Sequence, residues 1–351
     1  MSENKSINRP VFDMLRVLAT VMVFAIHFAG FRNLPKPNSV FMLFRHFNYG
    51  VCLFFAMSGY LIMQSLENSA NLKEYFIKRV SRIVPAYFAI LIFGIIVWDN
   101  VLGQMPKDSM LGIGWLRYFL FLNGIVPSNE YYYWNDLWGL WTMSSFMLFY
   151  MLAPIIRKCV KSYRASLAMV VFVIIAAYGY KAVEYRFLIG NNVPWAAELA
   201  GDSAVFNMIS FSFGTAAWYA VREGKSQNYL RIVVAVLAIF LAIREDTFNR
   251  IIWSLITVVF MLSMQNFSYT EHTEWIGRTF AFLSKYSFTV YLVHMPMIEL
   301  VEYFSEHVQY LGYAPFLGSV LVLTAVMTAA LHYFVEEPFA KLIKRSLPCR
   351  K

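Results

Sequence analysis

Repeated apolar runs, each long enough to cross a lipid bilayer, constrain the fold of this sequence more than any other feature. A helix of about 20 residues crosses the roughly 30 Å of hydrocarbon in a bilayer. The sequence therefore predicts an all-α protein, a polytopic transmembrane helix bundle with about ten spans. The runs lie at about 11–31, 45–66, 83–102, 138–156, 165–183, 204–221, 229–243, 249–265, 286–304 and 314–334.

The composition excludes an ordinary soluble domain. Hydrophobic residues make up 59% of the 351-residue chain and charged residues only 15%, whereas soluble domains have about 45–50% and about 25%. The net charge of +9 does not indicate a nucleic-acid partner, because the basic residues are dispersed between the apolar runs. The three cysteines, Cys52, Cys159 and Cys349, have no metal-ligand spacing, so we expect no metal site.

The basic residues between the runs predict the topology. Cytoplasmic loops of membrane proteins are enriched in lysine and arginine. With ten spans and both termini cytoplasmic, the inner segments hold 20 of these residues and the outer segments 9. We therefore expect a multi-pass protein of the cytoplasmic (inner) membrane, with one membrane domain at 1–340 and a short basic cytoplasmic tail at 341–351.

The segment 111–123 is apolar but short, and two glycines and Arg117 interrupt it. We interpret it as interfacial or re-entrant, since an eleventh span would reverse every later loop. The first run is interpreted as a retained span rather than a cleaved signal, because Arg16 and His27 lie within it.

Arg16 and His27 are charged or titratable groups within the first apolar run, where such groups are expensive and usually face a bundle interior. They are eleven residues apart, so a helix places both on one face, roughly 16 Å apart along its axis. Asp13, one turn before Arg16, is placed to pair with it or orient it. The alternatives are a snorkelling arginine and a hydrogen-bonded packing histidine.

Two further groups follow. Ser58, in FFAMSGYLI, is either a small residue at a close helix contact or a hydroxyl beside a reaction path. Arg79 and Arg82 are neighbours if their segment is helical, and such a pair can bind phosphate in a fork. A generic positive-inside cluster is the other interpretation of the two arginines.

The C-terminal third adds more polar groups at membrane depth. YSFTVYLVHMP contributes Tyr291 and His294, followed by Pro296, which opens backbone groups within a helix. VEEPF places Glu336 at the inner end of the last run. The outer segment PSNEYYYWNDLW is rich in aromatics, which fits either an interfacial aromatic belt or stacking against sugar rings.

Taken together, these segments resemble the acyltransferase type 3 family of integral membrane proteins. FDMLRVLATVMVFAIH is similar to the family's Asp-x-x-Arg opening, in which ten residues separate Arg from His. FFAMSG is similar to its Phe-Phe-x-x-Ser-Gly signature, and RVSR followed by IVPAYF to its Arg-x-x-Arg and proline. Weaker similarities are LWTMSSFMLFYMLAP, SKYSFTVYLVHMP and VEEPF.

One position departs from the family pattern. Many relatives carry Trp-Ser-Leu-x-x-Glu before Phe-Tyr, and Phe146 takes the acidic position here. From this segment we therefore assign only supporting roles, to Trp141 and Tyr150.

The resemblance implies an acyl-CoA donor, with acetyl-CoA the expected form, bound on the cytoplasmic side by Arg16, Arg79 and Arg82. His27 takes the position of the family's catalytic histidine, and Arg16 assists it. Neutral imidazole suits a general base that takes a proton from a sugar hydroxyl as it attacks the thioester. An acyl-enzyme relay through a serine or histidine is the alternative.

We therefore expect a membrane O-acyltransferase that modifies a cell-surface or lipid-linked glycan. A transporter with an intramembrane histidine and arginine site is the rival from another class. The absence of an internal repeat and the arginines at the cytoplasmic mouth favour the enzyme. A different membrane acyltransferase fold with a buried histidine is disfavoured by the order of the motifs.

Overall fold

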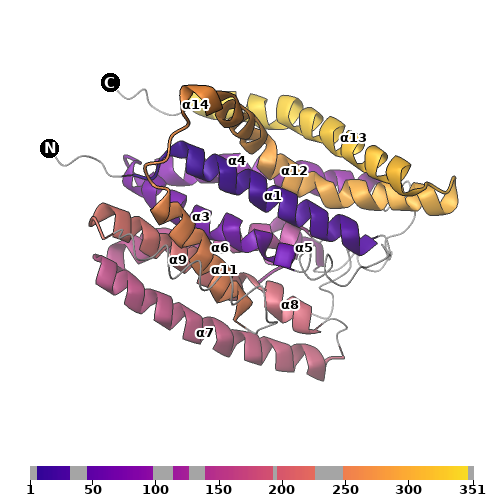
Figure 1. Ribbon diagram of the computed structural model, residues 1–351. Helices are drawn as coiled ribbons and strands as arrows, with labels where there is room; N and C mark the ends of the chain where they lie inside the picture. The colour runs from indigo at the N-terminus through magenta and orange to yellow at the C-terminus, as the bar shows by residue number, and fades with distance from the viewer. Residues whose placement is uncertain are drawn as a thin grey trace. The chain divides into compact units, whose positions relative to one another are not determined.

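The computed structural model describes residues 6–31, 46–97, 114–125, 139–192, 196–225 and 248–346, and these are helical with no β-strand (Figure 1). The all-α prediction is therefore confirmed for this part of the chain. The elements are α1 (Arg9–Phe31), η1 (Phe47–Tyr49), α3 (Gly50–Glu67), α4 (Leu72–Gly94), α5 (Gly114–Phe119), α6 (Trp141–Cys159), α7 (Tyr163–Gly190), α8 (Ala196–Asp202), α9 (Ala204–Arg222), α11 (Asn249–Ser263), η5 (Glu271–Thr273), α12 (Glu274–His307), α13 (Tyr313–Leu331), the π-helix η6 (His332–Glu336) and α14 (Glu337–Ser346).

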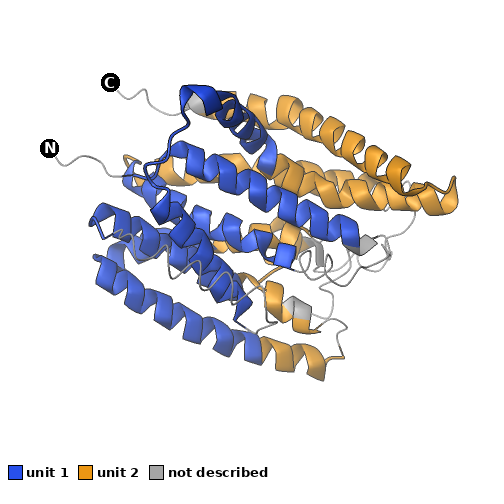
Figure 2. Cartoon of the chain, in the orientation of Figure 1, with its two compact units in different colours: residues 1–68, 149–182, 205–287 blue, residues 69–148, 183–204, 288–351 orange. Residues whose placement is uncertain are grey.

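The chain forms two compact units, each assembled from segments far apart in the sequence (Figure 2). Unit 1 comprises residues 1–68, 149–182 and 205–287, and unit 2 comprises residues 69–148, 183–204 and 288–351. Helices α6, α7 and α12 are divided between the two units, and α9 contributes its first residue, Ala204, to unit 2 and the rest to unit 1.

Six helices in the described ranges are long and apolar enough to cross a membrane. Nine of the ten predicted runs coincide with helices, and the tenth, 229–243, lies outside the described residues. Three of the nine helices, α6, α11 and α12, are not among the candidate membrane spans. The six candidate spans are Arg9–Ala29, Phe47–Glu67, Leu72–Val97, Tyr163–Gly190, Ala200–Arg222 and Tyr313–Ile343.

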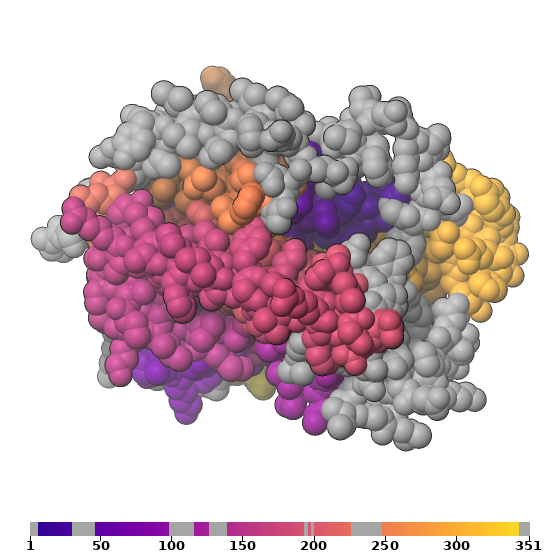
Figure 3. Space-filling view, turned by 90° about the horizontal axis from the view of Figure 1, so that it is seen from below, coloured from indigo at the N-terminus to yellow at the C-terminus, as the bar shows by residue number. Residues whose placement is uncertain are grey.

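Helix α7 lies at the face of the molecule seen in Figure 3, in magenta. Its exposed side carries large apolar side chains. Val171, Phe172 and Ile175 are 58%, 70% and 68% exposed. A helix with such a surface is unfavourable in water and stable in lipid, where burial of apolar area needs no protein partner. The apolar helices thus make this chain an integral membrane protein.

Helix α4 begins well before the apolar run predicted at 83–102. Asn71 caps it by accepting a hydrogen bond from the backbone N–H of Glu74 (2.9 Å), and the Glu74 carboxylate accepts one from the N–H of Ala70 (2.7 Å). Reciprocal capping of this kind satisfies backbone groups that a helix start leaves without partners. The basic segment that holds Arg79 and Arg82 is therefore helical.

The segment 111–123 forms only one short described helix, the six-residue α5. That length is far below what crosses a bilayer, so the segment is not a span. It packs against α4 within unit 2, where the Tyr87 hydroxyl donates to the Tyr118 carbonyl (2.7 Å) and the Tyr87 and Phe121 rings lie 4.4 Å apart.

Unit 1 is built around a close crossing of α3 and α9. Two glycines allow it: a Cβ on Gly59 would overlap the backbone carbonyl of Phe211, and a Cβ on Gly214 would overlap that of Ala56. Small residues at membrane helix contacts permit such close backbone approach. Gly50 at the start of α3 packs on α1 less closely, since its Cβ would lie 2.9 Å from Cγ2 of Val23.

Candidate active site

Helix α1 carries Arg16 and His27 on one face. It is unbroken from Arg9 to Phe31, so the expected spacing applies. The two positions are turned about 20° from each other and lie roughly 16 Å apart along the axis.

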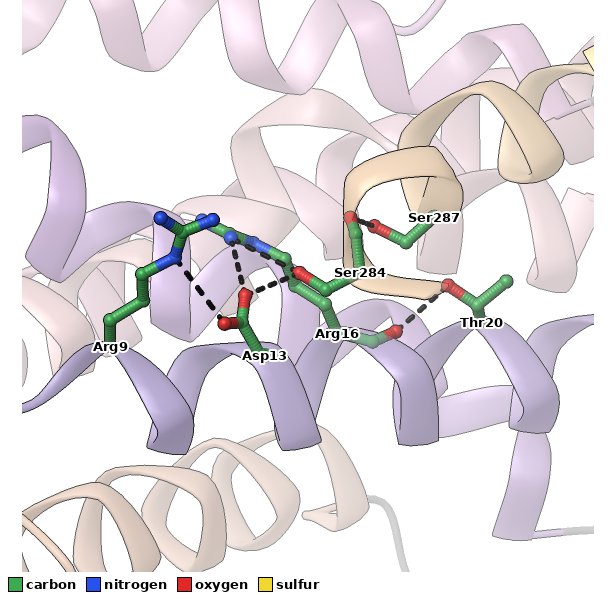
Figure 4. A network of polar contacts seen from close by, with 6 residues as sticks. All are labelled: Arg9, Asp13, Arg16, Thr20, Ser284 and Ser287. Atoms are coloured by element: carbon green, nitrogen blue, oxygen red, sulfur yellow. Dashed lines mark hydrogen bonds and ion pairs between the residues drawn. The ribbon is translucent and has the colours of Figure 1, made fainter. Parts of the chain in front are cut away.

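Arg16 belongs to a network centred on the buried carboxylate of Asp13 (Figure 4). Asp13 Oδ1 lies 3.6 Å from Arg16 Nη1 and accepts a hydrogen bond of 2.6 Å from the Ser284 hydroxyl. Asp13 Oδ2 lies 3.4 Å from Arg9 Nε. Arg16 Nη1 also donates to Ser284 Oγ (3.4 Å). The expected Asp13–Arg16 pair is therefore present, and it is anchored to α12.

Among the ion pairs of the described residues, two arginines, Arg9 and Arg16, surround the one carboxylate of Asp13. The Asp13 side chain is 6% exposed, that of Arg16 is 20% exposed and that of Arg9 is 81% exposed. A buried carboxylate is stable only when its charge is compensated and its oxygens are hydrogen-bonded. Asp13 thus holds the Arg16 guanidinium in place, and the group as a whole favours an anionic ligand.

Ser284 was not predicted from the sequence. It lies 268 residues from Arg16 along the chain, and its only sequence signal is a second serine, Ser287, one helical turn later in an aromatic segment. Both serines are buried, and the Ser287 hydroxyl bonds to the Ser284 carbonyl (2.8 Å).

Tyr269, which precedes η5, is a further polar group near Asp13. Its hydroxyl is buried, and its ring packs on Gly277 of α12. Burial, together with the Asp13 carboxylate, raises the pKa of Tyr269. The phenol therefore stays protonated and neutral at physiological pH.

His27 is partly buried, and one ring nitrogen hydrogen-bonds to the backbone carbonyl of Val23, one turn earlier. The nitrogen that bonds to a carbonyl must carry the proton, so in neutral imidazole the other nitrogen has the lone pair. This tautomer provides an oriented proton acceptor.

Arg79 and Arg82 lie one turn apart on α4, in unit 2. The Arg82 side chain is exposed and that of Arg79 is partly buried. The neighbouring Lys78 is paired with Glu74 at 2.5 Å. The structure thus gives the spacing expected of a phosphate fork, on a different unit from Arg16.

Ser58 lies on α3, partly buried, beside the close crossing with α9. The small residue that makes this close helix contact is the neighbouring Gly59 rather than Ser58. Ser58 keeps its predicted supporting role only as a hydroxyl in the same unit as His27.

The residues predicted on α6 fall into different units. Tyr150 is 4% exposed in unit 1, whereas Trp141 lies at the start of the helix in unit 2. Phe146 is buried, at 9% exposed. Sequence reasoning missed Ser144, which is fully buried and donates to Asn123 Oδ1 (2.6 Å).

Tyr291 and His294 lie together on the part of α12 within unit 2. His294 is 1% exposed, and its Nδ1 is 2.6 Å from the Tyr291 carbonyl oxygen. The Tyr291 hydroxyl donates to the Gly139 carbonyl (3.3 Å). The helix continues through Pro296, and His294 bonds to a backbone carbonyl one turn earlier on its own helix, as His27 does.

Glu336 lies in the π-helix η6, just before Pro338 in the first turn of α14. Its carboxylate accepts from the Thr289 hydroxyl (2.7 Å) and lies 2.9 Å from Nδ1 of His332. The sequence did not predict His332, although the four-residue spacing of a histidine and a glutamate was visible. Glu336 is thus paired within unit 2.

The structure therefore joins Asp13 and Arg16 directly and keeps His27 on the same helix. Ser58 and Tyr150 belong to the same unit as these three residues. The other candidates lie in unit 2: Arg79, Arg82, Trp141, Tyr291, His294 and Glu336. In the described ranges, no three His, Cys, Asp or Glu side chains are grouped as metal ligands.

The apolar helices indicate an integral membrane protein, and the arginine and histidine on one face of α1 indicate a polar site within it. The family model described as an acyltransferase domain, that of the acyltransferase type 3 family, matches residues 9–333. The chain belongs to this family and is a membrane acyltransferase. The expectation from the motifs is confirmed, and the family assignment decides against the transporter.

Curated relatives support the assignment at low identity. Nodulation protein 10 of Rhizobium leguminosarum is 27% identical over 67% of this chain and 68% of its own. An Acidianus two-tailed virus protein, provisionally named an acetyltransferase, is 24% identical over 83% of this chain and 84% of its own. A Staphylococcus aureus protein, provisionally named an O-acetyltransferase, is 24% identical over 83% of this chain but 52% of its own. No solved structure matches significantly.

Proposed function

We propose that this protein is an O-acetyltransferase of the cytoplasmic membrane, which moves an acetyl group from acetyl-CoA to a hydroxyl of a cell-surface or lipid-linked glycan. The observation that carries the proposal is the geometry of α1. One helix face holds an arginine oriented by Asp13 and Ser284 and, roughly 16 Å further on, a histidine with a defined tautomer.

The donor is proposed to bind by its phosphates. Coenzyme A carries a 3′-phosphate and a pyrophosphate, and guanidinium groups bind phosphate oxygens through paired, charge-assisted hydrogen bonds. Arg16 is held ready for such a contact, and Arg79 and Arg82 have the spacing of a second one. The extended pantetheine arm then directs the thioester toward His27.

At His27 the proposed reaction is direct acyl transfer. The acceptor hydroxyl oxygen attacks the thioester carbonyl, and the ring nitrogen of His27 that does not face the Val23 carbonyl takes the hydroxyl proton. The new C–O ester bond forms as the C–S bond breaks, and coenzyme A leaves as the thiolate. The thiolate then takes up the proton from the imidazolium of His27. General base catalysis of this kind contributes typically 10²–10⁴-fold.

The relatives' names support the acetyl group and the hydroxyl acceptor. Two carry acetyltransferase names, one of them with oxygen as the acceptor atom. A glycan acceptor fits an enzyme whose donor is cytoplasmic and whose catalytic histidine lies toward the far end of the first span. We propose ten spans with both termini cytoplasmic, in one membrane domain at 1–340 with a basic tail at 341–351.

The direct test measures acetyl-CoA consumption and acetyl incorporation into glycan by the purified protein. His27→Ala should lower the rate by at least a hundredfold with acetyl-CoA affinity unchanged. His307→Ala is the matched control, because His307 is exposed at the end of α12 and bonds only locally to the Tyr303 carbonyl. A folded His27→Ala protein with full activity would refute the proposed role.

The same assay separates direct transfer from a relay. Protein incubated with radiolabelled acetyl-CoA and no acceptor, then denatured, should carry no covalent label if transfer is direct. Label on a serine or histidine would establish an acyl-enzyme instead.

A further inference from the structure

A second buried polar cluster lies in unit 1, where the N-terminal end of α11 contacts both α9 and η1. Asn207, Asn249 and Arg250 are 0%, 6% and 8% exposed. Arg250 hydrogen-bonds to Asn207 Oδ1 and lies with its guanidinium carbon 5.1 Å from the centre of the Phe206 ring. We call these residues, with the aromatics described next, the α9–α11 cluster.

Aromatic rings complete the cluster. The Trp253 ring lies 6.4 Å from that of Tyr49 with only 12° between the ring planes, and 6.1 Å from that of His46. The Asn249 amide donates to the Tyr49 hydroxyl (3.2 Å), which ties α11 to η1. Amides, a guanidinium and aromatic faces therefore converge from three elements.

Two polar atoms of this cluster are buried without a hydrogen-bond partner: the Asn249 Oδ1 and the Trp253 Nε1. One is an acceptor and the other a donor. Leaving such an atom unsatisfied costs about 1–3 kcal/mol, and native proteins satisfy the great majority of buried polar atoms. A cluster that served only packing would satisfy these atoms within itself, as Ser254 does with Ser210 (2.7 Å) one turn further along α11.

The cluster lies at the end of unit 1 that holds His27. Element η1 contacts both α1 and α11, and Gly50, which follows η1, packs on Ala19 and Val23 of α1. His27 is one turn beyond Val23, on the same side of α1. Helix α3 runs antiparallel to α1, since Tyr60 lies beside Ile7 and Phe12. Element η1, which precedes Gly50, and the α9–α11 cluster are therefore on the histidine side of unit 1, away from Asp13 and Arg16.

From these contacts we infer that the α9–α11 cluster is the acceptor subsite and that it binds a saccharide ring. A sugar offers hydroxyls that both donate and accept, matching Asn249 Oδ1 and Trp253 Nε1, and an apolar C–H face that packs on an aromatic ring. Lipid tails match neither unsatisfied atom. The inference rests on the proposed function, since it places the hydroxyl acceptor beside His27.

The test uses full-length purified protein, radiolabelled acetyl-CoA and envelope glycan extracted from the expressing cells as the acceptor. Trp253→Phe keeps the ring and removes only the N–H, and Asn249→Ala removes the amide. Trp275→Phe is the matched control, because Trp275 is 67% exposed at the start of α12. Thr257→Val changes a buried group one turn further along α11 and controls for general disturbance of the helix.

Trp253→Phe should raise KM for the glycan about fivefold, as expected for one lost hydrogen bond. Asn249→Ala should raise it by at least as much, because it also removes the bond to the Tyr49 hydroxyl. The kcat at saturating glycan and the Kd for acetyl-CoA should not change. Trp275→Phe and Thr257→Val should leave KM unaltered. Unchanged KM in both cluster variants, or an equal rise in Thr257→Val, overturns the acceptor subsite while leaving the proposed function intact. Wild-type protein that neither binds acetyl-CoA nor transfers acetyl refutes the proposed function itself.

Discussion

The close crossing of α3 and α9 makes a sharp prediction for Gly59→Ala. The added methyl group would overlap the Phe211 carbonyl oxygen and lie 3.0 Å from the Phe211 carbonyl carbon and 3.1 Å from its Cα. These are backbone atoms of a helix, so they cannot rotate away as a side chain can. The two helices must separate, or the variant must accept the strain.

The expected loss of stability follows from two opposing effects. Overpacking a well-packed interface costs typically 1–3 kcal/mol, and an immovable backbone puts this case near the upper end. Replacing glycine by alanine within a helix returns up to about 1 kcal/mol. The net change is a destabilisation of about 2 kcal/mol, which for a chain of 351 residues corresponds to a fall in Tm of about 3 °C.

A buried cysteine on the same helix gives the assay. Cys52 is 0% exposed and lies on α3, seven residues before Gly59. With the other two cysteines replaced by serine, a thiol-reactive dye reports unfolding of purified protein as Cys52 becomes accessible on heating. Gly59→Ala should melt about 3 °C below its parent.

Gly179→Ala is the matched control, since nothing lies within 4 Å of a Cβ at Gly179 on α7. It should melt at or above the parent temperature. Equal melting temperatures for Gly59→Ala and Gly179→Ala would show that α3 and α9 do not approach as described.

Three further outcomes are expected. Replacing Arg79 and Arg82 together by glutamine should raise the Kd for acetyl-CoA about tenfold, because two charge-assisted contacts are lost. Calorimetry measures this Kd, with Lys78→Gln as the control. If the double variant binds acetyl-CoA as tightly as the control, the two arginines only mark the topology. Ser284→Ala should raise the same Kd about fivefold, because one charge-assisted bond that orients the arginine is lost, and an unaltered Kd would contradict that role. In a variant with Cys52 and Cys349 replaced by serine, Cys159 should react with a membrane-impermeant maleimide in everted vesicles and not in intact cells. The reverse pattern would invert the proposed topology.

Features that depend on residue spacing along one helix were predictable from the sequence. The eleven residues between Arg16 and His27 set their common face once α1 was helical. Asp13 is one turn from Arg16, and the pair forms as the spacing suggested. Apolar length likewise located most helices, because burial in lipid depends on local composition.

Contacts between distant segments were not predictable. Ser284 reaches Asp13 across 271 residues of sequence, and a serine in an apolar helix has no distinct signal for such a partner. Arg250 meets Asn207 across 43 residues for the same reason. Only the packing of α1, α9, α11 and α12 brings these groups together.

Hydropathy also missed polar helix turns. The first turns of α4 are polar, so the apolar pattern started its span at 83, although the helix starts at Leu72. The capping pair Asn71 and Glu74 was the available signal. Likewise, His332 and Glu336 stand one turn apart in a π-helix, whose wider turn no periodicity of 3.6 residues predicts.

The unbroken course of α1 means that the number of residues between Arg16 and His27, rather than their identity, encodes the position of the histidine. One inserted residue would turn His27 by about 100°, away from its face, whereas seven inserted residues would restore the face and lengthen the gap by about 10 Å. Apolar substitutions between the two should be tolerated, except at Ala19, Met22 and Val23, which Gly50 approaches. Insertions of different length can thus separate the direction of the imidazole from its distance to the donor's phosphates.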